Sequence, residues 1–102
     1  MLASFSIVPI GAGDELKEFI AELVSIIEKS GLPYAMGAMQ TTIEGEPEKV
    51  LELITNCHRR MRSRASRVLT HIIIDDREGA IGRLQGKIGD VEAILGRTVS
   101  HE

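Results

Sequence analysis

The stretch Met39–Glu46 reads MQTTIEGE, and Pro47 follows it directly. Ile43 alternates with Thr42 and Glu44, which is the period-two pattern of a β-strand with two different faces. Proline is well placed in the first turn of a helix, where its missing N–H would have no partner. This stretch therefore predicts a strand that leads into a helix and carries a carboxylate on one face of the sheet.

The same reading extends outward along the chain. Strands are predicted over Leu2–Ile10, Tyr34–Ala38, Thr41–Glu46 and Val68–Asp75. Helices are predicted over Glu15–Ser30, from Pro47 to Arg62 or Arg64, and through Ile81, Leu84, Ile88, Val91 and Leu95. Asp14 is a candidate N-cap of the first helix, and Gly31 fits the left-handed position that ends it.

Apolar spacing predicts which face each long helix buries. The first helix is expected to bury Leu16, Phe19, Ile20, Leu23, Val24 and Ile27, and the second Val50, Leu51, Ile54, Cys57, His58 and Met61. Residues three and four apart share one face of a helix, so each set forms a single stripe.

The element order predicts an α+β fold: a ferredoxin-like βαββαβ sandwich with an additional C-terminal helix, formed by residues 1–102 as a single domain. Both long helices would cover one face of an antiparallel sheet. Strand parity points Phe5, Ile7, Ile43, Ile72 and Ile74 toward the helices, and Ser4, Ser6, Thr42, Glu44, Leu69, His71 and Ile73 away from them. A face that mixes hydroxyls, a carboxylate, an imidazole and aliphatic side chains suits burial by a partner. A second copy of the chain is the simplest partner, and a ligand at that interface is compatible with it.

Composition excludes several classes of function. The net charge of −3 and the absence of tryptophan give no general attraction to nucleic acid. No apolar run approaches the ~20 residues that span a bilayer, and the first ten residues lack the pattern of a signal peptide. The single cysteine, Cys57, allows no internal disulfide, so a cytoplasmic location is expected.

Three segments carry a resemblance to a known family. FSIVPIG at Phe5–Gly11, TTIEGE at Thr41–Glu46 and IDDR at Ile74–Arg77 resemble, in order and at similar spacing, signature segments of the YkoF-like thiamine-binding protein family. The chain departs from that pattern with Ala38-Met39-Gln40-Thr41, where the family tends to read Pro-Met-Gly-Thr, and with Ile73, where the family often has a polar or basic residue.

The resemblance implies a non-enzymatic protein that binds thiamine or its hydroxymethylpyrimidine moiety and assembles as a homodimer or homotetramer. The ligand would be bound on the open sheet face near a subunit interface, without another cofactor, nucleic acid or membrane. The candidate ligand-binding residues are Ser6, Thr41, Thr42, Glu44, His71, Asp75 and Asp76.

Each candidate also has a simpler explanation. Glu44 could accept a hydrogen bond from an aminopyrimidine, or it could form an intersubunit salt bridge or lie in solvent at a strand end. Asp75 and Asp76 could offset a thiazolium charge or bind a metal, but turn chemistry also favours aspartate there. His71 could simply be a hydrogen-bonded packing residue. The arginines at 59, 60, 62, 64 and 67 suit a solvated helix end or a phosphate.

Two alternatives to a thiamine carrier remain at this point. One is a structural or regulatory homo-oligomeric module with no small ligand. The other is an enzyme that uses Asp75, Asp76 or His71. No nucleophile, base and orienting group occur together in the sequence, which disfavours an enzyme.

Overall fold

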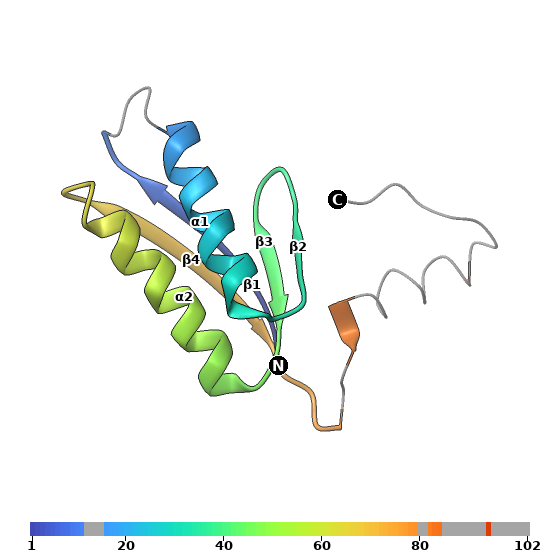
Figure 1. Ribbon diagram of the computed structural model, residues 1–102. Helices are drawn as coiled ribbons and strands as arrows, with labels where there is room; N and C mark the ends of the chain where they lie inside the picture. The colour runs from blue at the N-terminus through green and yellow to red at the C-terminus, as the bar shows by residue number, and fades with distance from the viewer. Residues whose placement is uncertain (12–15, 80–81, 85–93, 95–102) are drawn as a thin grey trace.

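The computed structural model describes residues 1–11, 16–79, 82–84 and 94. Its elements are β1 (Leu2–Pro9), α1 (Leu16–Ser30), β2 (Tyr34–Met36), β3 (Thr41–Glu44), α2 (Pro47–Arg62) and β4 (Val68–Asp75). The strands form one sheet in the order β2-β3-β1-β4, with every neighbouring pair antiparallel. Both helices lie on one face of this sheet (Figure 1). The predicted ferredoxin-like α+β fold is confirmed. Of the predicted C-terminal helix, residues 82–84 and 94 are described: residues 83, 84 and 94 are helical, whereas Gly82 forms a bend. The rest lies outside the described residues, as does Asp14.

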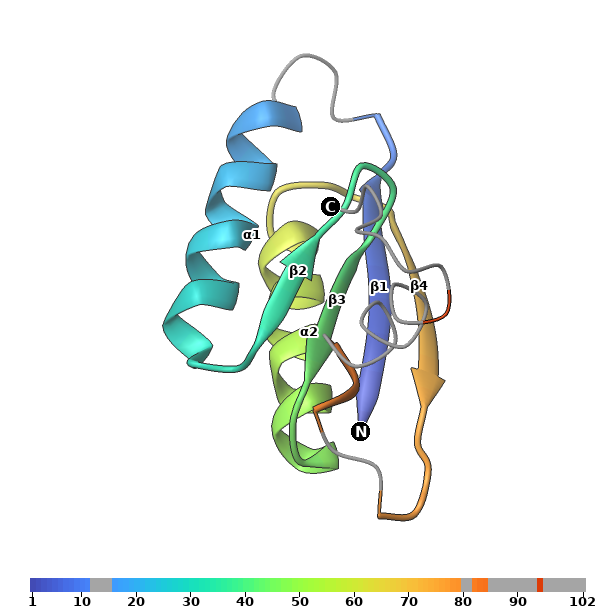
Figure 2. The same ribbon diagram turned by 90° about the vertical axis from the view of Figure 1, so that its right-hand side faces the viewer.

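The strand register confirms the predicted division into two faces. Phe5 lies opposite Thr41 on β3 and Ile72 on β4, whereas Ser6 lies opposite His71. Directly opposed residues of antiparallel strands project to the same face. Phe5 is buried under the helices, and Ser6 therefore belongs to the open face, which Figure 2 shows toward the viewer.

The core lies between the helices and β1 and β3. Its buried residues are Ala3, Phe5, Ile27, Ile43, Val50, Leu53, Ile54 and Cys57. Two predicted core positions were wrong, since Leu51 and Ile20 are exposed. In α2 the buried stripe uses Leu53, three residues after Val50, because Leu51 points about 100° away from Val50. In α1, Ile20 lies at the edge of the buried stripe, and its side chain lines a surface cavity and not the core.

Two predicted strands end earlier than expected. β2 stops at Met36 because the chain reverses over residues 37–40, where Gly37 donates its N–H to the Gln40 carbonyl at 2.9 Å. The end of β1 at Pro9 agrees with the prediction, since proline has no N–H for a ladder bond. β3 stops at Glu44, although Gly45 still exchanges two hydrogen bonds with Met1, at 2.9 and 3.1 Å.

Gly31 ends α1 in the left-handed conformation, with φ +75°, as predicted. This conformation disfavours any residue with a Cβ by roughly 1–2 kcal/mol, and asparagine tolerates it best. Gly31→Val is therefore expected to lower the free energy of unfolding by about 1–2 kcal/mol, and Gly31→Asn by clearly less. Urea unfolding of the three proteins measures this difference. Equal losses for valine and asparagine would contradict the conformational explanation, because no atom lies within 4 Å of a Cβ added there.

Candidate functional site

Glu44 is the last residue of β3, and its backbone is fixed from two sides. It pairs with Leu2 on β1, and its N–H donates to the Pro33 carbonyl at 3.1 Å. Because Ile43 is fully buried on the helix side, the side chain of Glu44 points to the open face. The carboxylate is thus held at the end of the sheet by a rigid strand.

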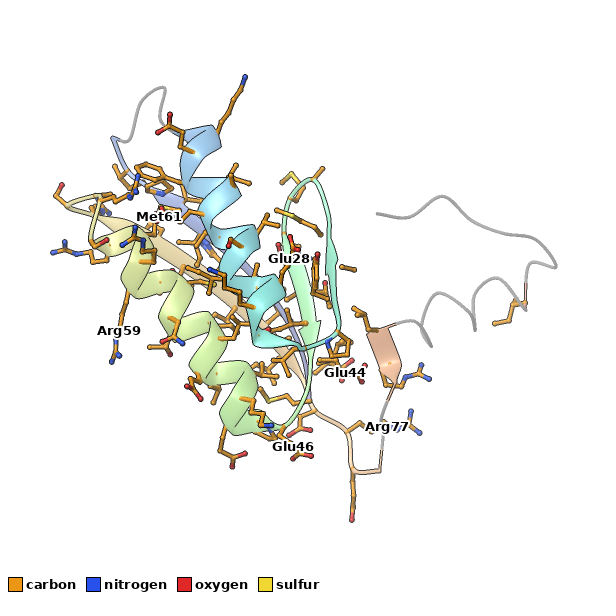
Figure 3. The ribbon with its side chains drawn as sticks, in the orientation of Figure 1. Glu28, Glu44, Glu46, Arg59, Met61 and Arg77 are labelled. Carbon is orange, nitrogen blue, oxygen red and sulfur yellow. The ribbon has the colours of Figure 1, made fainter. Side chains whose placement is uncertain are left out.

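The carboxylate of Glu44 accepts two backbone hydrogen bonds from a distant part of the chain. The N–H of Arg83 donates to Oε2 at 2.8 Å, and the N–H of Leu84 donates to Oε1 at 3.3 Å. Figure 3 shows Glu44 beside this short segment. Glu44 is therefore neither a solvated strand end nor a salt-bridge partner within the described chain. It ties residues 83 and 84 to the open face.

A cavity of about 640 Å³ opens beside Glu44 at this end of the sheet. Its lining residues are Met1, Leu32, Pro33, Glu44, Gly45, Glu46, Pro47, Lys49, Asp76, Arg77, Glu78, Gly79 and Gly82. Four of them are acidic and two, Lys49 and Arg77, are basic. Glu44, Glu46 and Arg77 project at this end of the molecule (Figure 3). We call it the acidic cavity, since its charge favours a small cation over an anion.

The acidic cavity contains two of the seven predicted site residues, Glu44 and Asp76. Asp75 lies near them on the open face, because Leu2 is the register partner of both Glu44 and Asp75. Neighbouring strands of a sheet are ~4.8 Å apart, and β3 and β4 lie on either side of β1. The backbones of Glu44 and Asp75 are therefore separated by roughly 10 Å across Leu2. These carboxylates flank one end of the sheet.

The remaining predicted residues lie farther along the sheet. Ser6 and His71 oppose each other across β1 and β4, and Thr42 opposes Ser4 across β3 and β1, all on the open face. Thr41 projects to the helix side, where it is buried opposite Phe5. The structure thus brings six of the seven residues to one face or its edge and separates Thr41 from them by the sheet.

Ser4 was predicted to lie on the open face but was not among the predicted ligand-binding residues. Ser4 Oγ is buried, and among the described side chains it is the buried polar atom without a hydrogen-bond partner. Its register partners are Thr42 and Ile73. Buried hydroxyls in native proteins nearly always have a partner, so this position suits a group supplied by a ligand, a water molecule or a second chain.

A second, smaller cavity of about 230 Å³ lies under α1 at the β2–β3 turn. Phe5, Ile20, Leu23, Ile27, Met36 and Met39 are among its apolar lining residues, and Ser6, Gln40 and Thr41 also line it. Its volume is below the ~300–1,000 Å³ typical of ligand sites, and its lining carries no ionisable side chain. The acidic cavity is the stronger candidate for a charged or strongly hydrogen-bonding ligand.

Sequence reasoning missed several groups at the acidic cavity. Glu46 is predicted only as the last residue of a strand, Glu78 and Lys49 are not among the candidate residues, and the amides of Arg83 and Leu84 are not predicted as part of the site. The side chains have a weak signal, namely charge clustered near a strand end. Backbone donors have none, because every residue except proline has one.

The arginine cluster in and after α2 is partly structural. Arg60 and Arg64 both form ion pairs with Glu22 on α1, and the guanidinium of Arg64 lies 5.4 Å from the centre of the Phe19 ring. Arg62 donates to the Ala65 carbonyl at 3.2 Å. These contacts join the two helices and cap the end of α2, which leaves a smaller set of arginines for an anion than the sequence suggested.

His58 and Cys57 do not form a catalytic pair. His58 Nδ1 lies 2.6 Å from Thr70 Oγ1 on β4, whereas Cys57 is fully buried in the core. Burial raises the pKa of the Cys57 thiol from 9.0 to about 11. The thiol therefore stays protonated in the fold at neutral pH and has little reactivity as a nucleophile.

This pKa gives a prediction for stability at high pH. The unfolded thiol ionises near pH 9 and the folded one near 11, so its contribution is complete below pH 9 and is lost as pH rises toward 11. At pH 10 the loss is on the order of 1 kcal/mol. Urea unfolding at pH 8 and pH 10 should show this extra loss in the wild type but not in Cys57→Ala. Identical pH dependence in both proteins would contradict it.

Neither a cluster of potential metal ligands nor a helix able to span a membrane is found in the part of the chain that is described. Within residues 1–11, 16–79, 82–84 and 94, no three His, Cys, Asp or Glu side chains are placed to hold a metal ion together. None of the described helices has both the length and the apolar character needed to cross a bilayer.

Comparison with known proteins matches almost the whole chain. The family model "Thiamine-binding protein" matches residues 3–92. The UPF0045 protein Mb1933 of Mycobacterium bovis is 33% identical over 96 residues, covering 93% of this chain and 94% of that protein. The UPF0045 protein MJ1052 of Methanocaldococcus jannaschii is 27% identical over 94 residues, covering 89% and 94%.

Solved structures show the same fold. The crystal structure of MJ1052 superposes with a TM-score of 0.80 at 23% identity, over 88% of this chain and 93% of that one. The protein TM0486 of Thermotoga maritima, which is provisionally described as a thiamine biosynthesis/salvage protein, superposes with a TM-score of 0.77. It is 27% identical, with 88% of this chain and 96% of that one covered.

Proposed function

The chain belongs to the thiamine-binding protein family, and on this premise we propose that it binds thiamine or its hydroxymethylpyrimidine moiety at the acidic cavity, without catalysing a reaction. The observation that carries this proposal is Glu44, an oriented carboxylate at the edge of a cavity in which acids outnumber bases. The ligand offers complementary groups, namely an exocyclic amino donor on the pyrimidine and a positive charge on the thiazolium ring.

The proposed pose follows from these charges. The amino group of the pyrimidine donates to Glu44, and the thiazolium ring lies toward Asp76 and the other acids of the cavity. A hydrogen bond to a charged group is worth ~1.5–3 kcal/mol. The cavity volume of about 640 Å³ lies within the range of small-molecule sites.

Other predicted residues extend the proposed site along the open face. Asp75, across Leu2 from Glu44, adds negative charge near the cavity. Ser6, Thr42 and His71 are proposed as further contacts for a ligand that reaches along the sheet, and Ser4 Oγ is an available hydrogen-bonding group there. Thr41 is not part of this proposed set because it faces the helices.

Isothermal titration calorimetry tests the proposal directly. Thiamine and hydroxymethylpyrimidine are expected to bind. Thiamine diphosphate is expected to bind at least tenfold more weakly than thiamine, because its phosphates would enter a site with excess negative charge. Oxythiamine has a carbonyl in place of the pyrimidine amino group and is the matched control ligand; it should also bind at least tenfold more weakly. No binding of thiamine or the pyrimidine would refute the proposed function.

A second candidate function, a homo-oligomeric assembly module, is favoured by the surface of β4. This edge strand exposes Leu69 and Ile73 on the open face, and Ile72 and Ile74 on the side that faces the helices. Exposed aliphatic side chains on an edge strand usually mark a surface that another chain covers. We propose that a second copy covers the open face at β4, forming a dimer or a tetramer, and this assembly is compatible with ligand binding nearby.

A further inference from the structure

Glu44 accepts backbone hydrogen bonds from Arg83 and Leu84, and it is also the residue proposed to bind the ligand. Resting on the proposed function, we propose that the amides of Arg83 and Leu84 position the Glu44 carboxylate that binds the ligand, so that docking of residues 82–84 and ligand binding at the acidic cavity strengthen each other. The inference concerns three residues outside the sheet that the family resemblance did not single out.

The two hydrogen bonds leave Glu44 able to accept a ligand. An ionised carboxylate has about four acceptor positions on its two oxygens. Arg83 uses one position on Oε2 and Leu84 one on Oε1. A ligand amino group can therefore bond to Glu44 while both amides stay in place, and it meets a carboxylate that is already oriented. Fixing a binding group in advance reduces the entropy lost when the ligand binds.

The lining of the cavity includes the residue directly before the segment held by Glu44. Gly82 lines it together with residues 76–79, residues 44–47 and others. Gly82 has φ +67°, a left-handed conformation that suits glycine and turns the chain immediately before the two donors. Release of residues 83 and 84 from Glu44 would therefore free the carboxylate to reorient and would free the chain next to Gly82.

This arrangement requires a reciprocal effect. If the docked segment improves ligand affinity by a given factor, the bound ligand must favour the docked segment by the same factor. Loss of one backbone donor to a charged acceptor can change affinity by about tenfold or more. If the segment only competed with the ligand for Glu44, docking of the segment and binding of the ligand would instead weaken each other.

Hydrogen exchange at the amides of residues 83 and 84 measures docking without reference to ligand affinity. In the ligand-free wild type these amides are expected to exchange at least tenfold more slowly than in Glu44→Gln. Saturating thiamine should slow them further in the wild type. Unchanged exchange in Glu44→Gln would overturn the anchoring role, and faster exchange on adding thiamine would show competition and overturn the proposed coupling.

A proline substitution tests the donor itself. Arg83→Pro removes the N–H, at a position in the first helical turn where proline is tolerated, and leaves Glu44 intact. The matched control, Arg83→Ala, removes the side chain and keeps the N–H. Thiamine binding by calorimetry is expected to weaken about fivefold or more in Arg83→Pro and to stay within about twofold in Arg83→Ala.

The outcomes separate this inference from the proposed function. Equal affinities in Arg83→Pro and Arg83→Ala, with circular dichroism showing both folded, would overturn the positioning role while thiamine binding still stands. If the wild type binds no thiamine or hydroxymethylpyrimidine, the proposed function fails and the coupling fails with it.

Discussion

Replacing Glu44 with glutamine is expected to weaken thiamine binding at least tenfold and to leave the protein folded. Glutamine keeps the size of the side chain and one acceptor oxygen but removes the negative charge and the second acceptor. Loss of a charge-assisted hydrogen bond of ~1.5–3 kcal/mol corresponds to roughly a 10- to 150-fold change in affinity. The core should be unaffected, because the buried cluster is built from Ile43 and its apolar neighbours and does not include Glu44.

Calorimetry with thiamine on Glu44→Gln measures this effect, and Glu48→Gln is the matched control. Glu48 lies in the first turn of α2, is exposed and does not line the acidic cavity. The two variants have the same change in net charge, so any general electrostatic attraction falls equally in both. Similar affinities for the two variants would mean that Glu44 contributes only long-range charge and does not contact the ligand.

Oxythiamine adds a second test of the same hydrogen bond. If the pyrimidine amino group donates to Glu44, removing either the donor or the acceptor removes the same interaction. The two losses should then be strongly non-additive when Glu44→Gln is titrated with oxythiamine. Additive losses would place the amino group elsewhere in the cavity, even if both single changes weaken binding.

The fold could be predicted from the sequence because its signals are local. The bounds of β4 agree with the prediction, and the two faces of β1, β3 and β4 follow from the alternation of side chains along each strand. A one-residue shift of register would have moved every side chain to the other face, so this pattern constrains the sheet strongly. Gly31 similarly marks the end of α1 through its own backbone preference.

Predictions that depended on packing between elements were less accurate. Leu51 and Val50 are adjacent apolar residues, and only their orientation toward the sheet decides which one is buried. The early end of β2 depends on a hydrogen bond between Gly37 and Gln40 that closes the turn. The choice between Leu51 and Val50 has no distinctive residue type, and although Gly37 is a turn signal, it does not determine at which residue the strand ends.

For the candidate site, the sequence predicted only which strand and which face of the sheet each residue belongs to. Strand parity identified Glu44 as a carboxylate on the open face, and the same parity places Thr41 with Ile43 on the helix side, against its prediction as a site residue. Parity cannot show that Asp76 shares a cavity with Glu44. The contact between Glu44 and residues 83 and 84 spans about 40 positions in sequence and uses backbone donors. Such a contact depends on the complete fold and not on any local pattern.

Replacing Ile73 with lysine is expected to convert an oligomeric wild type into monomers. Ile73 is 64% exposed on the open face of β4, and its neighbours Ile72 and Ile74 are 44% and 47% exposed. Burying a lysine without a partner costs several kcal/mol, whereas a lysine on a solvent-exposed edge strand is well tolerated. The substitution therefore opposes association and leaves the monomer intact. Sedimentation velocity at micromolar concentrations measures the change.

Leu51→Lys is the matched control for this substitution, because Leu51 is 44% exposed on α2, away from the open face. It should leave the assembly unchanged. A monomeric wild type would refute the assembly proposal, and an oligomeric Ile73→Lys would place the interface elsewhere. Thiamine titration of the monomeric variant then decides how binding and assembly are related. Unchanged affinity would mean that the acidic cavity is complete within one chain. A loss of tenfold or more would mean that either the second copy or the open face around Ile73, which lies opposite Ser4, contributes to the site, since Ile73 does not line the cavity itself.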